Sequence, residues 1–335
     1  MHSGLSSNGA SSDVVRAPPS DDAPIVLVPG IFGFGAEKMG KISYWGGAEN
    51  RADRVFLPEL GPLSSMHDRA CELFYQLKGG RVNFGKEHSQ RYGHCQFGHT
   101  YSGLYPEWDK DHPVHFVGHS SGVQAVRLLH TMLDEKFFPE YPDTNAEWIS
   151  SVTSLSGALN GTTRVYLDGI SYATRKTRRV LGRALPSSLR IHPLLFLRTI
   201  QIGCWKHPST HPKPHESYRD EDWQENDGAL NTISMLYPKL PEEHPHYPLN
   251  QVDLSESGAH ERELRLKPGI WYYTMLNVDH IHFIINRRRA GVKHDMLYDS
   301  IFRRCRKQFL RAAIGSLESS SCVCMDESES ECLVP

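Results

Sequence analysis

The chain has 335 residues, of which 39% are hydrophobic and 10% aromatic. This length suits one large α/β domain with insertions or two small domains. A formal net charge of -2 argues against nucleic acid or a strongly charged substrate as a partner. The seven cysteines are odd in number and scattered, which indicates free thiols in a reducing compartment rather than a disulfide framework.

The two end segments are predicted to be disordered. Residues 1–22 are rich in Ser, Asn, Gly and Asp and lack the apolar run of a signal peptide, and residues 318–335 form an acidic, Ser-rich tail. We therefore expect one domain over residues 23–317. No membrane-spanning run is evident, so we expect a cytoplasmic protein, with secretion or an organelle as the alternatives.

The first predicted strand is a continuous apolar run at residues 24–28, typical of a central parallel strand buried on both faces. A Gly-rich loop at residues 29–35 follows it. Glycines at the end of a strand let backbone N–H groups approach a ligand closely. The same pattern also fits an ordinary turn.

Next along the chain, residues 54–58 are a plausible second strand. Residues 61–80 predict a capped helix, with Ser64 or Ser65 at its start and Gly79 just past its end. We expect residues 81–106, which are rich in His, Tyr and Gly, to form a loop.

The strongest motif is the run Gly118-His119-Ser120-Ser121-Gly122. An apolar run at residues 114–117 precedes it, and apolar residues at helical spacing follow it. Strand, G-x-S-x-G and helix in this order indicate a nucleophile elbow, in which small residues must flank a serine on a tight turn. In such folds the oxyanion hole uses the N–H of the residue after the nucleophile and one N–H from the first strand's loop, here Ser121 and Ile31.

The later elements are less sharply defined. Residues 148–155 predict a strand, residues 238–250 an irregular segment, residues 269–276 a strong strand and residues 295–316 the last helix. Residues 164–215 alternate Arg and Lys with Leu and Ile, which predicts one or two amphipathic helices outside the sheet. This insertion is either a cap whose basic face could contact a lipid surface or an ordinary solvated face.

A serine hydroxyl needs a base to accept its proton, and the base needs a partner that fixes its tautomer. In this fold the chain order is Ser, then Asp or Glu, then His. Ser120, Asp227 in an Asn-Asp-Gly turn and His280 after the strong strand satisfy that order. Asp279 and His282 remain rivals on sequence pattern alone.

Several further blocks of the chain stand out between about residue 24 and 285. They are Tyr44-Trp45-Gly46-Gly47, Gly61-Pro62-Leu63-Ser64-Ser65-x-x-Asp68-Arg69-Ala70-Cys71-Glu72, Gly98-x-Thr100-Tyr101, Glu225-Asn226-Asp227-Gly228 and Asn277-Val278-Asp279-His280. These blocks resemble the thermoalkalophilic, zinc-containing bacterial triacylglycerol lipases and their plant relatives. The resemblance implies an α/β-hydrolase fold, with a mostly parallel central sheet flanked by helices, and hydrolysis of acylglycerol esters. Position by position, it implies Ser120 as nucleophile, Asp227 as acid and His280 as base.

The resemblance also implies a structural zinc held by two Asp and two His. Asp68, His88 and His94 match three of these ligands. The second Asp, which precedes a Trp in the family's cap, has no counterpart, because the comparable stretch has Cys204 before its Trp. Cys204 could substitute, since thiolate binds zinc well, but the fourth ligand stays unknown.

Two departures from the family qualify these expectations. The acid of the family's calcium site is replaced by His282, and the next acidic ligand is replaced near Arg287, so we expect no calcium. The segment between Thr163 and Asp227 is much shorter than in the bacterial enzymes, which implies a shortened helical cap.

The leading hypothesis is a serine lipase or esterase with no organic cofactor. The first alternative is an esterase or thioesterase for small soluble acyl substrates. The second is a catalytically inactive relative that binds a lipid or a protein partner. We expect an ester substrate, possible peripheral contact with lipid, no nucleic acid and no transmembrane segment.

Overall fold

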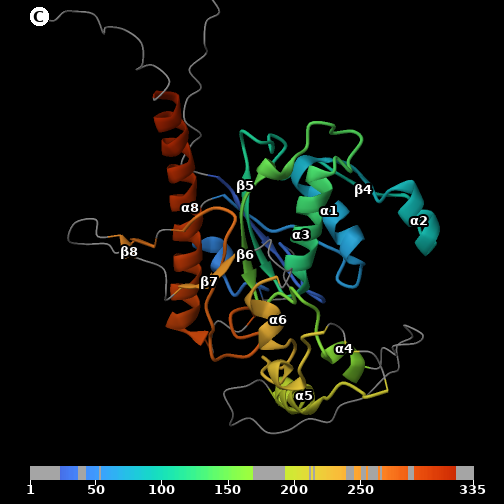
Figure 1. Ribbon diagram of the computed structural model, residues 1–335. Helices are drawn as coiled ribbons and strands as arrows, with labels where there is room; N and C mark the ends of the chain where they lie inside the picture. The colour runs from blue at the N-terminus through green and yellow to red at the C-terminus, as the bar shows by residue number, and fades with distance from the viewer. Residues whose placement is uncertain are drawn as a thin grey trace, which may run out of the picture.

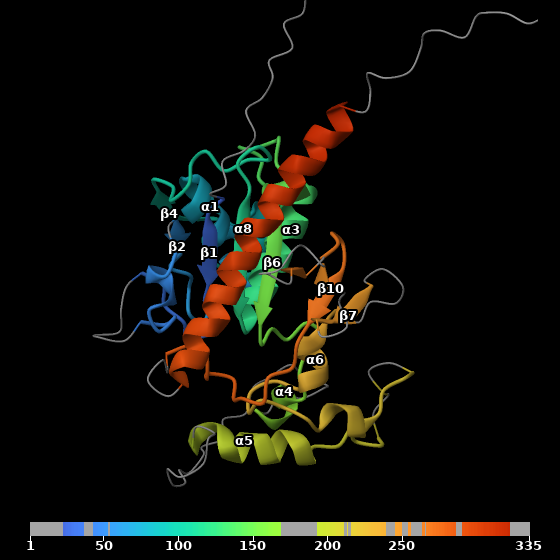
Figure 2. The same ribbon diagram turned by 90° about the vertical axis from the view of Figure 1, so that its left-hand side faces the viewer.

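The computed structural model describes residues 23–36, 43–52, 54–168, 193–210, 213, 216–238, 245–249, 254–255, 263–264, 266–285 and 290–321. Within them a four-stranded parallel sheet forms the centre, in the order β2-β1-β5-β6. Helices flank it on both faces, so the α/β class predicted from the sequence is confirmed (Figures 1 and 2). The strands are β1 (Ile25–Val28), β2 (Val55–Phe56), β5 (Val114–His119) and β6 (Ile149–Leu155).

The two central strands, β1 and β5, are buried along their whole length, as their continuous apolar runs predict. Successive side chains of a strand point to opposite faces. Val26 and Val28 therefore enter one hydrophobic core with α1 and α3, and Ile25 and Leu27 enter a second core with α8. The helices are α1 (Met66–Lys78), α3 (Ser121–Asp134) and α8 (Val292–Ser321).

Helix α1 shows how local chemistry sets its limits. The Ser65 hydroxyl accepts a hydrogen bond from the Asp68 N–H at 3.1 Å, and the helix ends at Gly79. Between these ends the helix buries a wide apolar face that packs against α3. The capped helix predicted within residues 61–80 is confirmed, with Ser65 rather than Ser64 as its N-cap.

The loop predicted for residues 81–106 is wrong. β3 (Gly80–Asn83) and β4 (Phe97–Tyr101) pair as an antiparallel hairpin that encloses α2 (Lys86–Tyr92). Most of β4 is exposed, and the pairing contains an irregular register between Arg81 and Asn83. Neither strand therefore carries the apolar alternation by which strands are recognised in a sequence.

A smaller group of elements lies beyond the carboxyl ends of the sheet strands (Figures 1 and 2). Its helix α5 is apolar on one side and stands outside the sheet, as predicted for residues 164–215, of which 169–192, 211–212 and 214–215 lie outside the described residues. The group contains α4 (Arg164–Leu167), α5 (Pro193–Cys204), η3 (Asp220–Trp223) and α6 (Thr232–Leu236).

The remaining boundaries differ from those predicted. The segment 238–250, predicted to be irregular, contains β7, which pairs in parallel with β10. β10 is shorter than the strand predicted at residues 269–276, and α8 continues past residue 317 into the predicted tail. Residues 1–22 and 322–335 lie outside the described residues. The remaining elements are η1 (Ala48–Asn50), η2 (Ala146–Trp148), β7 (His246–Pro248), β8 (Leu254–Ser255), β9 (Glu263–Leu264) and β10 (Trp271–Tyr273).

Two of the sequence-based expectations concern the hydrophobicity of the helices and the state of the cysteines. Among the described residues, no helix combines the length and the apolarity needed to cross a membrane. Cys71, Cys95, Cys204 and Cys305, the described cysteines, are free thiols.

A buried histidine on β5 makes the fold sensitive to acid. Burial lowers the pKa of His115 from 6.5 to about 4, and its Nδ1 lies 2.7 Å from the Ser151 hydroxyl. Below pH 6.5 the unfolded chain takes up a proton at this residue that the folded chain refuses. The stability that neutral His115 contributes is therefore present above pH 6.5 and is lost as the pH falls toward 4.

We predict that His115→Gln removes about 2 kcal/mol of the difference in unfolding free energy between pH 7 and pH 5. Urea unfolding at both pH values measures this difference. The control is His130→Gln, because His130 is exposed on α3. An equal pH dependence in the wild type and His115→Gln would contradict the prediction.

Candidate active site and candidate metal site

Ser120 stands at the turn between β5 and α3. Its φ of 53° and ψ of −126° lie outside the regions that L-residues ordinarily adopt. Its N–H donates to the Leu155 carbonyl at 2.9 Å, which ties the turn to β6. The hydroxyl therefore projects at the amino end of α3, where unpaired backbone N–H groups favour negative charge.

The glycines on either side of Ser120 allow this turn. A Cβ on Gly122 would lie 2.3 Å from the Val28 carbonyl oxygen, and one on Gly118 would lie 2.8 Å from the Val123 nitrogen. In both cases the obstacle is backbone and cannot rotate away. The elbow predicted from the G-x-S-x-G pattern has this steric basis.

Three side chains from distant parts of the chain meet at the turn. The Ser120 hydroxyl lies 2.9 Å from His280 Nε2, and His280 Nδ1 lies 2.7 Å from Asp227 Oδ2. A carboxylate can only accept, so Asp227 holds the proton of His280 on Nδ1. The lone pair of Nε2 then faces the serine hydroxyl. The structure places His280, rather than its rival His282, beside Ser120.

The Asn-Asp-Gly turn prepares Asp227 for this contact. Asp227 Oδ1 accepts hydrogen bonds from the N–H groups of Ala229 at 2.9 Å and Leu230 at 2.8 Å. The Asp227 carbonyl also accepts the N–H of His280 at 3.0 Å, so backbone and side chain hold the same loop. Asp227 and His280 side chains are each only 8% exposed.

Several effects act on the carboxyl of Asp227. Burial acts to raise its pKa, but the hydrogen bonds and charge of His280 and the two backbone N–H groups outweigh burial, so the pKa is lowered. The stability that this carboxylate contributes is present at neutral pH and is lost only as the pH falls through the lowered folded-state pKa. Asp227 thus remains an acceptor through mildly acidic pH.

A buried polar chain connects three loops behind the serine. The Tyr44 hydroxyl accepts the Gly30 N–H at 2.9 Å and lies 2.7 Å from His119 Nδ1, and His119 Nε2 lies 3.0 Å from the His280 carbonyl. A carbonyl can only accept, so Nε2 of His119 carries the proton and Tyr44 donates to Nδ1. Burial lowers the pKa of His119 to about 3, in keeping with this neutral tautomer.

Arg69 orients the loop after β1. Its guanidinium is fully buried and donates to the carbonyls of Gly61 at 2.7 Å, of Gly30 at 3.3 Å and of Pro29. In a trans peptide the C=O and the following N–H point in opposite directions. Because Arg69 holds the Gly30 carbonyl, the N–H of Ile31 points away from Arg69.

Sequence reasoning identified the three residues at the turn but missed their supports. Tyr44 and Arg69 lie in blocks that carry the family resemblance, and His119 lies in the G-x-S-x-G run, yet nothing in their local pattern indicates a buried hydrogen bond. The signal that could have raised the question is a polar residue within an otherwise apolar setting, as with His119 at the end of β5.

A second cluster, which contains none of the three residues at the elbow, gathers around one carboxylate oxygen. Asp68 Oδ1 lies 3.1 Å from His88 Nε2 and 3.8 Å from His94 Nε2, so the structure brings together the three residues predicted as metal ligands. It adds His67, whose Nδ1 lies 3.6 Å from the same oxygen. His67, Asp68 and His88 form a group whose ligand atoms all lie within 4.8 Å of one another and could hold a metal ion.

The alternative fourth ligand considered from the sequence, Cys204, is not brought to this cluster. It ends α5, which lies at the bottom of the view in Figure 1, whereas α2 lies at its right-hand side beside β4. At the family's calcium position, the backbone N–H of His282 donates to the Asp279 carbonyl at 3.1 Å. Arg287 lies outside the described residues.

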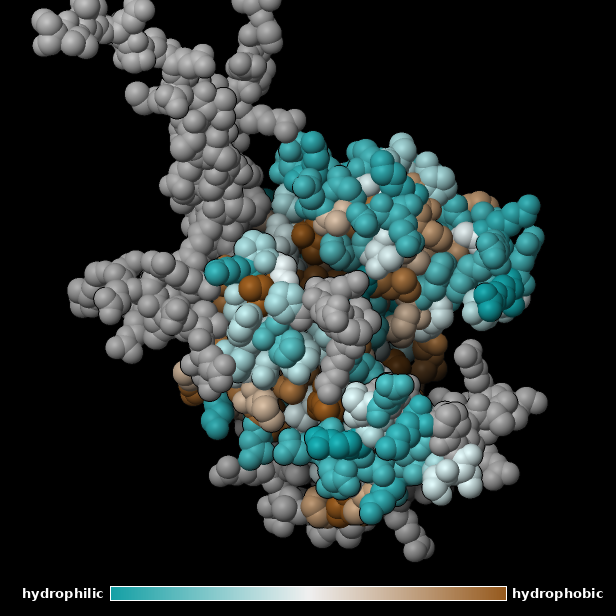
Figure 3. All heavy atoms as spheres, viewed as in Figure 1, coloured by the Kyte–Doolittle hydropathy of each residue, from teal (hydrophilic) through white to brown (hydrophobic). Residues whose placement is uncertain are grey.

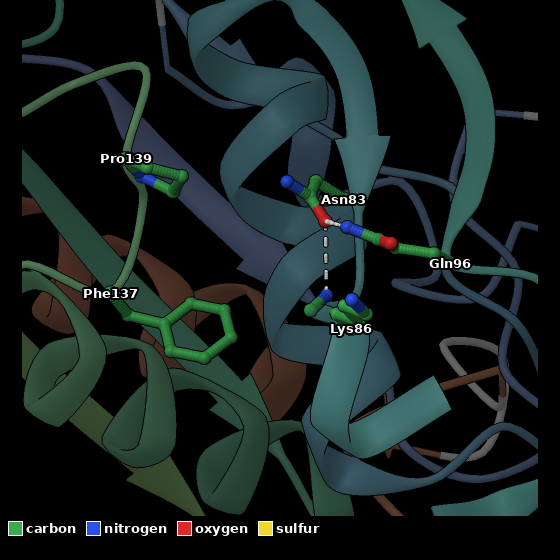
Figure 4. Close-up of a pocket in the computed structure, with 6 residues that line it drawn as sticks. Asn83, Lys86, Gln96, Phe137 and Pro139 are labelled. Atoms are coloured by element: carbon green, nitrogen blue, oxygen red, sulfur yellow. Dashed lines mark hydrogen bonds between the residues drawn. The ribbon is translucent and has the colours of Figure 1, made fainter. Parts of the chain in front are cut away.

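A small pocket of about 180 Å³ opens beside β3 and α2 (Figure 4). The side-chain oxygen of Asn83, Oδ1, accepts hydrogen bonds from the Gly85 N–H and from the Gln96 side-chain amide. The pocket contains none of the three residues that meet at the elbow. It is lined by Asn83, Gly85, Lys86, Gln96, Phe137 and Pro139.

The geometry defines an α/β protein in which a serine at a strand–helix turn contacts a His–Asp pair. Residues 21–186 match the family described as lipase-like, C-terminal domain. The lipase of Staphylococcus hyicus is 40% identical over 135 residues, which cover 37% of this chain and 21% of that protein. Lipase 1 of Staphylococcus aureus is 35% identical over 163 residues, covering 42% of this chain and 24% of that protein.

The match to this lipase-like family model is confined to residues 21–186, and the relatives that align with this chain are bacterial lipases. The aligned region spans about a quarter or less of the length of these curated relatives. Among solved structures, lipase 1 of Pelosinus fermentans has a TM-score of 0.64 at 23% identity, over 84% of this chain and 99% of that one. The Staphylococcus hyicus lipase has a TM-score of 0.58 at 22% identity, over 88% and 97%. The overall fold is thus shared with lipases.

We predict that Gly122→Ala destabilises the protein by about 1–3 kcal/mol, because the new methyl group would overlap backbone at Val28. Thermal or urea unfolding measures the loss. Thr131→Ala on the exposed side of α3 is the matched control and should stay within about 0.5 kcal/mol. A Gly122→Ala protein as stable as the control would contradict the steric account of the turn.

Tyr44→Phe should cost about 1–3 kcal/mol of unfolding free energy, because it leaves the Gly30 N–H and His119 Nδ1 buried without their shared partner. Urea unfolding gives the number, and Tyr92→Phe at an exposed tyrosine is the control. Equal stability of the two variants would show that the hydrogen bonds of the Tyr44 hydroxyl do not stabilise the fold.

Proposed function

We propose that the chain hydrolyses carboxylic esters of acylglycerols on an α/β-hydrolase fold, through a covalent intermediate on Ser120. The observation that carries the proposal is the continuous contact from Asp227 through His280 to Ser120. The family of residues 21–186 and the bacterial lipases related to it support the same class of reaction.

In the first half of the reaction, Ser120 Oγ attacks the ester carbonyl carbon and His280 Nε2 accepts the hydroxyl proton. The tetrahedral intermediate collapses when His280 returns this proton to the leaving alcohol, and the acyl group remains on Ser120. In the second half, His280 takes a proton from water, whose oxygen attacks the acyl carbon. Collapse then frees the acid and restores the serine. Asp227 keeps the other proton on Nδ1 throughout.

The N–H groups of Ile31 and Ser121 are the proposed oxyanion donors. Ser121 opens α3, where the first N–H groups have no partner within the helix, and the contacts of Arg69 turn the Ile31 N–H outward. One such donor contributes roughly 3–4 kcal/mol to the transition state in a measured hydrolase. Arg69 acts on this hole only through the backbone.

An apolar rim near the serine suits a lipid substrate. Ile31 is 51% exposed and Phe32 is 69% exposed on the loop after β1, and Leu63 is 72% exposed on the adjacent loop. The Phe32 N–H donates to the Pro62 carbonyl at 3.0 Å, which holds the two loops together. Figure 3 shows hydrophobic surface in the recess between the body of the molecule and its lower part. We propose that this rim contacts acyl chains or a lipid surface.

We also propose that Asp68, His88 and His94 bind a structural zinc ion. Carboxylate oxygen and imidazole nitrogen are suitable zinc ligands, and the three residues converge on a single point. When bound, the ion would cross-link α1 to α2. It takes no part in the ester chemistry, because the cluster and the serine are separate sites.

We predict that Ser120→Ala abolishes turnover of p-nitrophenyl esters and that Asp227→Asn lowers kcat about 10⁴-fold, because it removes the acceptor that fixes the tautomer of His280. A fluorophosphonate probe should label Ser120 in the wild type only. Thr131→Ala, with its side chain exposed on α3, should retain full activity. Undiminished turnover in Ser120→Ala would refute the mechanism.

The same assay separates the alternatives. A profile of activity against acyl length that rises toward long chains supports an acylglycerol lipase. A peak at acetate or butyrate would assign a small acyl substrate instead. A folded wild-type protein that the probe does not label would identify a binding protein rather than a hydrolase.

A further inference from the structure

Helix α2, which lies between β3 and β4, makes few hydrophobic contacts. Helix α2 has only seven residues, and among its described side chains Ser89 alone is buried. A helix of this length is marginal unless other contacts hold it. The His cluster connects α2 to α1, because His88 contacts both Asp68 and His67.

In this cluster, at least one nitrogen lone pair lies opposite another hydrogen-bond acceptor instead of a donor. His94 Nδ1 lies 3.0 Å from the Cys95 carbonyl, which can only accept, so Nδ1 carries the proton. The lone pair of His94 Nε2 then faces the Asp68 carboxylate at 3.8 Å. Two electron-rich atoms that face each other in this way are stabilised when a cation lies between them. A carbonyl partner on the remote nitrogen is also the usual arrangement for a metal-binding histidine.

The distances suit a tetrahedral ion. Zinc binds nitrogen and carboxylate oxygen at about 2.0–2.1 Å, so neighbouring ligand atoms on a tetrahedron stand about 3.3 Å apart. Asp68 Oδ1 lies 3.1 Å from His88 Nε2, 3.6 Å from His67 Nδ1 and 3.8 Å from His94 Nε2. All three distances are measured from Asp68 Oδ1, and the separation of about 3.3 Å expected around a tetrahedral ion lies within their range.

His67 lies next to the position where a fourth ligand is needed. It is in the first turn of α1, and its ring stacks on that of His88 with centroids 3.6 Å apart. Because an imidazole binds a metal in the plane of its ring, one of the two rings must turn out of this stack when both bind the same ion. The Phe137 ring packs against His67 in a T-shaped contact with centroids 5.4 Å apart. Phe137 also lines the small pocket in Figure 4.

We infer that His67 is the fourth ligand of this site, so that the metal is held by three His and one Asp entirely within residues 67–94. The site then needs no residue from the region of α4 and α5, which lies in the lower part of Figure 1, below α2. The inference rests on the proposed zinc at Asp68, His88 and His94 and is independent of ester hydrolysis.

The test measures zinc binding to the purified full chain by competition with a chromophoric chelator, with stoichiometry from elemental analysis. We expect one zinc per wild-type chain and an affinity lower by on the order of 100-fold in His67→Ala, since even the loss of groups that only orient ligands costs 10–100-fold. His88→Ala should lose the metal.

Two variants serve as controls. His112→Ala removes a histidine that pairs with Asp109 at 2.9 Å outside the cluster, and Cys204→Ser removes the thiol that ends α5. Both should bind zinc as the wild type does. Zinc affinity in His67→Ala within threefold of the wild type, or a loss in Cys204→Ser, would overturn the inference. A wild-type chain that binds no zinc would overturn the proposed zinc site as well.

Cobalt substitution gives a readout that misfolding cannot imitate. Cys71 Sγ lies 3.9 Å from His67 Nδ1, so the neighbouring thiol is the rival ligand. The wild-type cobalt protein should show the strong visible bands of a four-coordinate ion without a thiolate charge-transfer band. A thiolate band in the wild type that disappears in Cys71→Ala would assign the fourth position to Cys71 and overturn the inference.

Discussion

The tight turn from β5 into α3 is the constraint on which the rest of the site depends. Ser120 occupies a backbone conformation that costs roughly 1–3 kcal/mol, and it persists because the surrounding structure leaves no alternative. The turn is bound to β6 through the Ser120 N–H, and Gly122 lies directly against the Val28 carbonyl of β1. Both neighbours are strands of the central sheet, and β1 is buried along its whole length, so the sheet holds the strained residue in place.

Around this turn, a few buried hydrogen bonds hold together loops that are far apart in the sequence. Tyr44 and His119 join the loop after β1 to the loop that carries His280, and each partner is left with a single possible proton arrangement. Such a network is stabilising only when all its members are satisfied. The first turn of α1 serves both sites: Arg69 reaches inward to the loop after β1, and the adjacent Asp68 faces the histidine cluster.

Local patterns predicted those features whose causes are local. A continuous apolar run predicted β1 and β5 because both faces of these strands are buried, and a serine followed by a helical apolar face predicted α1. The pattern failed at residues 81–106, where β4 is mostly exposed and its pairing is irregular. The pattern also failed at the C-terminal end of α8. The last residues of this helix are polar, so apolar periodicity does not indicate where the helix ends.

The sequence alone determined the class of fold, the position of Ser120 and the turn that presents Asp227, because each follows from residue types within a few positions of one another. The local pattern left His280 and His282 as rivals, and the family resemblance implied His280. The tertiary structure shows His280 in contact with the serine, and it alone shows that His67 joins His88 and His94 at one oxygen. These choices depend on how helices and strands pack. Packing brings together residues that lie up to 160 positions apart in the chain, a relation that no local pattern encodes.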